Sequence, residues 1–119
     1  MHILLTRQLQ DSKDLIQKFK SNGFKVSNLP LLEISKSDYN ETKIYNHNAI
    51  IFTSSNAIRF LDLKNINKNI LCFCVGSYTE KTARSNGFQN VFAADGNVRN
   101  LKELIQQNLP EKDNKILYV

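Results

Sequence analysis

The sequence has no tryptophan and only two cysteines, two histidines and two prolines among its 119 residues. Cys72 and Cys74 lie one residue apart in an apolar run, so both side chains point to one face of the predicted strand. That placement suits neither a disulfide nor a closed metal site, and we expect two buried thiols. His2 and His47 lack the spacing of metal ligands, and we expect no metal site.

Long apolar runs and dense basic blocks are also missing. No segment could span a membrane, and the N-terminus becomes polar too quickly for a signal peptide, so cytoplasmic residence is the default expectation. The net charge is +5, but the basic residues are scattered and no aromatic residues alternate with them. We therefore ascribe the charge mainly to composition, and expect neither nucleic acid nor a membrane as a partner.

The chain does contain alternating strand and helix patterns. The first helix is expected to begin at the cap residues Asp11 and Ser12 and to stop at Asn22 and Gly23. The other predicted helices cover about 55–63, 78–86 and 98–109, and the predicted strands cover 3–5, 24–26, 49–53, 70–75, 90–93 and 115–119. This order predicts an α/β fold, a parallel sheet covered by helices.

The last helix shows the clearest apolar face. Its apolar residues recur at helical spacing, and all are expected in the core: Val98, Leu101, Leu104, Ile105 and Leu109. The chain then stops inside an apolar strand, so we expect that it has been cut from a longer polypeptide.

Two strand-to-helix junctions contain most of the candidate ligand-binding residues. FTSSNAIRF at residues 52–60 and VGSYT at residues 75–79 each pass from an apolar strand through small hydroxyl or glycine residues into a helix. Backbone N–H groups then lie at the carboxyl end of a strand, a place that favours anions.

The motifs, taken in order, resemble those of the uroporphyrinogen-III synthase family: LLTR at 4–7, LPLLEI at 29–34, FTSSNAIR at 52–59, and VGxxT at 75–79 followed by GF at 87–88. The resemblance implies two flavodoxin-like lobes joined by a two-stranded ladder, with the substrate between the lobes. Residues 1–28 would be a βαβ piece of the first lobe, residues 29–36 a ladder or linker strand, and residues 37–119 an incomplete second lobe.

The resemblance also implies an activity that needs no cofactor, the cyclisation of hydroxymethylbilane to uroporphyrinogen III in haem biosynthesis, with inversion of ring D and loss of water. Such an enzyme must hold a flexible polycarboxylate in a compact shape. Thr79 matches the family threonine that faces the cleft, and is the expected catalytic residue. The expected substrate-binding residues are Arg7, Thr53, Ser54, Ser55, Asn56, Gly76, Ser77 and Thr79.

Structural explanations for these residues stay open. Thr53, Ser54 and Ser77 could simply cap helices, Gly76 could simply form a tight turn, and Arg7 could be a solvated arginine. The chain's tyrosines at 39, 45 and 78 match no motif and receive no role.

The chain departs from the family in two ways. Glu80 replaces the usual alanine after the threonine, and its charge would repel a substrate carboxylate. The second ladder strand and the tyrosine associated with catalysis would lie beyond Val119. If the polypeptide ends there, we expect little activity, and the alternative is a non-catalytic fragment that binds an anionic tetrapyrrole or self-associates through residues 1–34.

Two other α/β classes fit less well. A phosphoacceptor receiver domain needs acidic residues at strand ends, where this chain has Thr6-Arg7 and Thr53-Ser54. A flavin-binding flavodoxin needs a phosphate loop rich in hydroxyl and glycine residues after the first strand, and residues 6–12 do not supply one.

Overall fold

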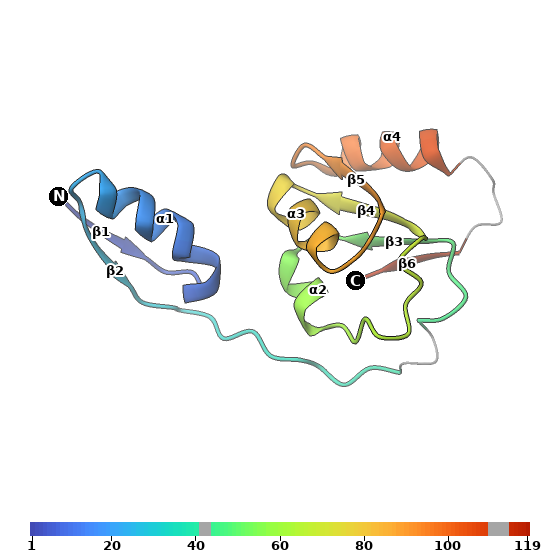
Figure 1. Ribbon diagram of the computed structural model, residues 1–119, viewed down its shortest axis with the longest axis horizontal. Coiled ribbons are helices and arrows are strands. Elements are labelled where there is room, and N and C mark those ends of the chain that lie inside the picture. Colours follow the sequence, from blue (N-terminus) through green and yellow to red (C-terminus); the bar gives the residue numbers. More distant parts are fainter. Residues whose placement is uncertain (41–43, 110–114) are drawn as a thin grey trace. The chain divides into compact units, whose positions relative to one another are not determined.

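A computed structural model describes residues 1–40, 44–109 and 115–119. The chain forms two compact units, Met1–Ser35 and Lys36–Val119 (Figure 1). The fold is α/β, with parallel sheets and flanking helices, and is consistent with the flavodoxin-like class.

The first unit is a small βαβ element. Strand β1 (His2–Leu5) pairs in parallel with β2 (Lys25–Asn28), and helix α1 (Leu9–Ser21) connects them. The helix stops where the sequence predicts, because Asn22 donates its backbone N–H back to the last turn and Gly23 follows at φ 80°. Phe19 and Phe24 then pack edge to face across this turn, with ring centroids 6.1 Å apart.

The predicted start of α1 is wrong by one turn. The helix begins at Leu9 after Gln8, which makes no side-chain cap, so the sequence carried no capping signal there. Ser12 is buried inside the helix, and its hydroxyl lies 3.5 Å from the carbonyl oxygen of Arg7.

Residues 29–36, predicted as a ladder or linker strand, do not form a strand in the structure. Backbone N–H groups of Leu29 and Leu31 donate to Leu5 and Thr6, which extends the contact with β1 only slightly. A strand requires a partner, and no described segment pairs with residues 31–34.

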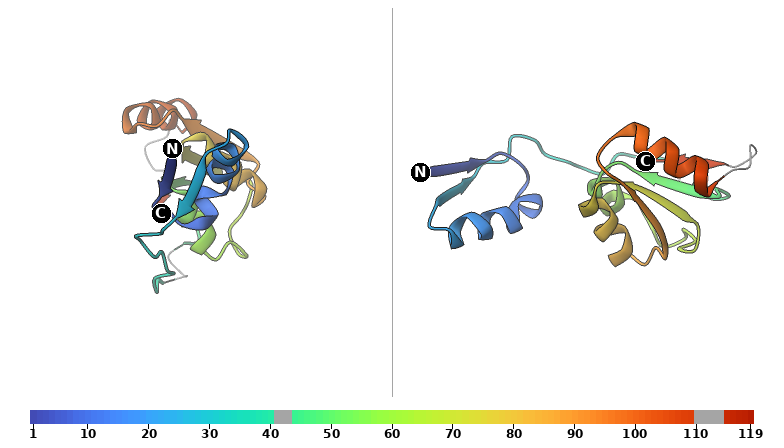
Figure 2. Two further views of the ribbon diagram at one scale, coloured as in Figure 1. Left: turned by 90° about the vertical axis from the view of Figure 1, so that its left-hand side faces the viewer. Right: turned by 90° about the horizontal axis from the view of Figure 1, so that it is seen from above.

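The second unit is a three-layer α/β arrangement. Its sheet contains β3 (Ala49–Phe52), β4 (Leu71–Val75), β5 (Asn90–Ala94) and β6 (Ile116–Tyr118), in the order β5-β4-β3-β6, and every pair is parallel. Helices α2 (Ser55–Phe60) and α3 (Ser77–Ser85) cover one face, and α4 (Val98–Asn108) covers the other (Figures 1 and 2).

Each face of this sheet carries its own apolar core. Strand β3 is buried along its whole length, because its side chains alternate between the two faces of the sheet and helices cover both faces. Ile50 and Phe52 pack under α2 and α3, in a cluster that includes Cys72 and Cys74. The cluster on the α4 side consists of Ala49, Ile51, Phe73 and Ala94 of the sheet and Leu101 of α4 itself.

Two helix predictions in this unit need correction. Helix α2 ends at Phe60 rather than residue 63, because Leu61 turns to an extended backbone with ψ 136°. Leu61 and Leu63 still pack on the core from the following loop, which is why the apolar spacing imitated a longer helix. Val98 is 80% exposed at the start of α4 and is not a core residue.

The topology determines where the predicted site lies. In a parallel sheet all carboxyl ends meet at one edge, and β3 and β4 are direct neighbours. The loop from β3 into α2 and the loop from β4 into α3 therefore lie side by side at that edge. These two loops and the first turns of the helices that follow them hold all the predicted site residues except Arg7.

Candidate functional site

The first loop of the site begins helix α2. Ser54 is the N-cap residue, and its hydroxyl accepts a hydrogen bond of 3.2 Å from the backbone N–H of Asn56. The capping explanation therefore holds for Ser54. Thr53 is exposed and Ser55 is buried.

The second loop begins helix α3 without a side-chain cap. Gly76 is the N-cap residue at φ 82° and ψ 150°, a conformation that essentially only glycine adopts. The tight-turn explanation therefore holds for Gly76. Its N–H donates to the carbonyl oxygen of Ala94 at 3.0 Å, which ties the loop to β5. The first-turn N–H groups of Ser77, Tyr78 and Thr79 have no acceptor within the helix.

Thr79 combines burial with an unused hydroxyl. The residue is only 6% exposed, and its hydroxyl makes no hydrogen bond to another described residue. No fully buried polar side-chain atom of the described chain lacks a partner, so the hydroxyl oxygen must reach solvent. A threonine whose body is packed and whose hydroxyl is free is a well-positioned donor to a ligand.

Arg59 joins the two loops. Its Nη1 donates to Asn56 Oδ1 at 2.9 Å, and its Nη2 donates to Tyr78 Oη at 2.8 Å. The guanidinium also lies 5.8 Å from the centre of the Tyr78 ring. Neither Arg59 nor Tyr78 was a predicted site residue, although Arg59 lies in the motif at 52–59 and Tyr78 directly precedes Thr79.

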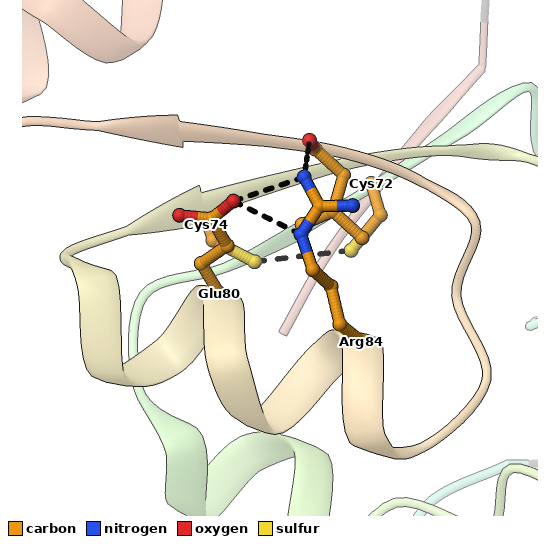
Figure 3. Close-up of polar contacts among 5 residues, drawn as sticks. Cys72, Cys74, Glu80 and Arg84 are labelled. Atoms are coloured by element: carbon orange, nitrogen blue, oxygen red, sulfur yellow. Dashed lines mark hydrogen bonds and ion pairs between the residues drawn. The ribbon is translucent and has the colours of Figure 1, made fainter.

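Glu80 is held by an ion pair on its own helix. Arg84, one turn later, donates to one Glu80 carboxylate oxygen from Nε at 3.0 Å and from Nη2 at 2.9 Å (Figure 3). Nη2 also donates to the carbonyl oxygen of Val91 at 2.8 Å. The acidic charge that departs from the family pattern is thus partly offset by its neighbour.

A family model described as uroporphyrinogen-III synthase HemD matches residues 13–119. The chain belongs to the uroporphyrinogen-III synthase family. No curated protein matches the sequence. The match covers both loops at the carboxyl edge of the second unit, together with the three later motifs that carried the resemblance.

Arg7 is the one predicted site residue outside the second unit. It is exposed after β1, and its carbonyl oxygen accepts a hydrogen bond of 2.8 Å from Asn28 Nδ2. Arg7 belongs to the first unit, and its role in the synthase site stays a prediction.

The two cysteines lie behind the site, in the core under α3. Their sulfur atoms are 3.9 Å apart, and both thiols are free and buried (Figure 3). The hydrogen bond to Cys74, together with burial, raises the pKa of the Cys72 thiol far above its usual value. Among the described residues no group of three potential metal ligands occurs, and no helix is long and apolar enough to cross a membrane.

A separate apolar hollow of about 360 Å³ lies beside α2 and β6. None of the predicted synthase site residues lines it. Its lining includes Lys36, but its walls are mostly apolar, with Phe60 and Leu117 among them, and offer a substrate with several carboxylates little compensation for lost hydration. The carboxyl-edge loops are therefore the better candidate site.

Proposed function

We propose that the carboxyl-edge loops of the second unit hold hydroxymethylbilane for the synthase reaction, in which the linear tetrapyrrole loses water and closes to uroporphyrinogen III with ring D inverted. The acetate and propionate groups of this substrate are anions that helix N-termini attract. The single observation that carries the proposal is Thr79, packed against the core with an uncommitted hydroxyl.

The chemistry assigned to the site is positioning and hydrogen bonding. The first-turn N–H groups of α3 bind a substrate carboxylate, and the Gly76 turn leaves them open because it brings no side chain that could cap them. The Thr79 hydroxyl donates to the departing hydroxyl group of the substrate or to a second carboxylate. The bound shape of the flexible substrate then favours closure over side reactions.

A turnover assay with hydroxymethylbilane tests the proposal, with the type I and type III isomers of the product separated. Uncatalysed closure leaves ring D uninverted, so excess type III product supports the synthase activity. Binding of the coloured, stable porphyrin uroporphyrin III without turnover supports the alternative, a non-catalytic tetrapyrrole-binding fragment. If neither turnover nor binding occurs, both readings are wrong.

Self-association through residues 1–34 is a second proposal, favoured by exposed leucines in the first unit. Leu4 and Leu29 are each 56% exposed, and Leu32 is 75% exposed. A two-stranded sheet with one helix buries too little surface to hide such residues. Sedimentation at rising protein concentration should show a mass increase that Leu32→Lys reduces, and a constant monomer mass would contradict the proposal.

A further inference from the structure

We propose that Tyr78 is a further substrate-binding residue of this site and that Arg59 is the residue that positions it. The inference rests on the proposed function, because it assigns one more hydrogen-bond donor to the same polycarboxylate. Neither residue belongs to the part of the motifs that carried a predicted role, and the contact between them joins two helices that are separate in sequence.

The position of Tyr78 favours this role. It occupies the first turn of α3, directly before Thr79, and it is 45% exposed. Its hydroxyl oxygen accepts the hydrogen bond from Arg59 Nη2 at 2.8 Å. A phenol can accept and donate at the same time, and its proton makes no hydrogen bond to another described residue.

Arg59 makes that phenol a better donor and limits its movement. A hydrogen bond from a cation draws electron density from the phenolic oxygen, which strengthens the bond that the phenol donates. Asn56 holds the other side of the guanidinium at 2.9 Å, so the arginine is fixed by both helices. Tyr78 is consequently held at the edge where the first-turn N–H groups of α3 are open.

The chemical class of the ligand follows from this arrangement. A phenolic O–H, the Thr79 hydroxyl and backbone N–H groups are all donors, and they are grouped at the positive end of a helix dipole. Such a set fits a carboxylate better than a neutral carbonyl. We assign Tyr78 to the carboxylate that also contacts the first turn of α3.

Binding of uroporphyrin III to the full chain, followed by its absorbance change, tests the inference with Tyr78→Phe and Arg59→Met. Each is expected to weaken binding about tenfold, the usual effect of losing a hydrogen bond to a charged group. Tyr45→Phe is the matched control, because it removes an exposed tyrosine hydroxyl that precedes β3 and lies at the other edge of the sheet. This control is expected to bind like the wild type.

The double variant Arg59→Met, Tyr78→Phe distinguishes a positioning role of Arg59 from a general structural defect. If Arg59 acts through Tyr78, the Arg59→Met and Tyr78→Phe effects do not add, and Arg59→Lys recovers part of the affinity. Additive effects would overturn the positioning role of Arg59, and wild-type affinity in Tyr78→Phe would overturn the inference while leaving the proposed function intact. Failure of the wild-type chain to bind uroporphyrin III would overturn both.

Discussion

Arg84 donates two hydrogen bonds to the Glu80 carboxylate, at 3.0 and 2.9 Å, and so places a positive charge beside the acidic residue nearest to Thr79 in sequence. The Arg84 side chain is 50% exposed and that of Glu80 is 31% exposed, so solvent screens this pair and its contribution to stability is small, about 0.5 kcal/mol. Its larger effect is expected on anion binding, because Glu80 lies in the first turn of the helix that forms the proposed site.

Arg84→Gln should therefore weaken binding of uroporphyrin III about two- to threefold, since it leaves the Glu80 charge without its partner. The effect should shrink as salt is raised, because screening reduces the repulsion. Titrations at low and high salt measure it. The double variant Glu80→Gln, Arg84→Gln should recover the affinity, and a double variant as weak as Arg84→Gln would show that charge is not the cause.

Thr79→Val should reduce ligand binding about tenfold while changing the free energy of unfolding by less than about 1 kcal/mol. The Thr79 hydroxyl bonds no other described residue, so the fold loses little when it is replaced by a methyl group. Urea denaturation and uroporphyrin III titration give the two numbers. Ser85→Ala, at the other end of α3, should bind normally, and normal binding by Thr79→Val would remove Thr79 from the site.

Gly76→Ala should cost about 1–3 kcal/mol of stability through backbone strain alone, because a Cβ at this position meets no atom within 4 Å. The strained turn also reorients the first N–H groups of α3, so binding should weaken as well. Gly23→Ala is the control: it has a similar φ of 80° and open space, but lies at the end of α1. Chemical denaturation should detect a loss of stability in both variants, but only Gly76→Ala should weaken binding. An equal loss of binding in both variants would contradict a local effect at Gly76.

The contribution of Cys72 to the stability of the chain should fall as the pH rises above about 9. The Cys72 pKa is raised in the folded chain above its usual value of 9.0, so unfolded molecules release this proton first and alkaline pH favours unfolding. The slope contributed by Cys72 is about 1.4 kcal/mol per pH unit. Urea denaturation between pH 7 and 11 measures it. Cys72→Ala should be less stable at pH 7 yet less sensitive to alkali, and an unchanged slope would contradict the assignment.

Most of the second unit could be predicted from its sequence because short apolar runs alternate with helical patterns, and because β3 and β4 are followed directly by a hydroxyl residue and a glycine. The predictions were wrong where tertiary packing, rather than the local sequence, determines whether a residue is helical or buried. Leu61 and Leu63 keep helical spacing although they pack from a loop, and Val98 keeps it although its side chain is exposed. The start of α1 carried no signal, since Gln8 makes no cap.

The loops of the site could be predicted from the sequence, but the hydrogen bond between Arg59 and Tyr78 could not. Hydroxyl and glycine residues after β3 and β4 marked the edge, and local geometry then decided which of them cap a helix or form a turn. The bond between Arg59 and Tyr78 depends on two neighbouring helices and on the reach of a long side chain. No periodicity or spacing in one helix encodes that contact.

Backbone amide shifts of the ¹⁵N-labelled chain during a uroporphyrin III titration show directly which part of the chain binds the ligand. The largest shifts should fall on Ser77, Tyr78 and Thr79, with smaller ones on residues 54–56, and the amides around Gly23 should not shift. Shifts confined to the apolar hollow beside β6, or to the first unit, would contradict the claim that the carboxyl-edge loops bind the substrate.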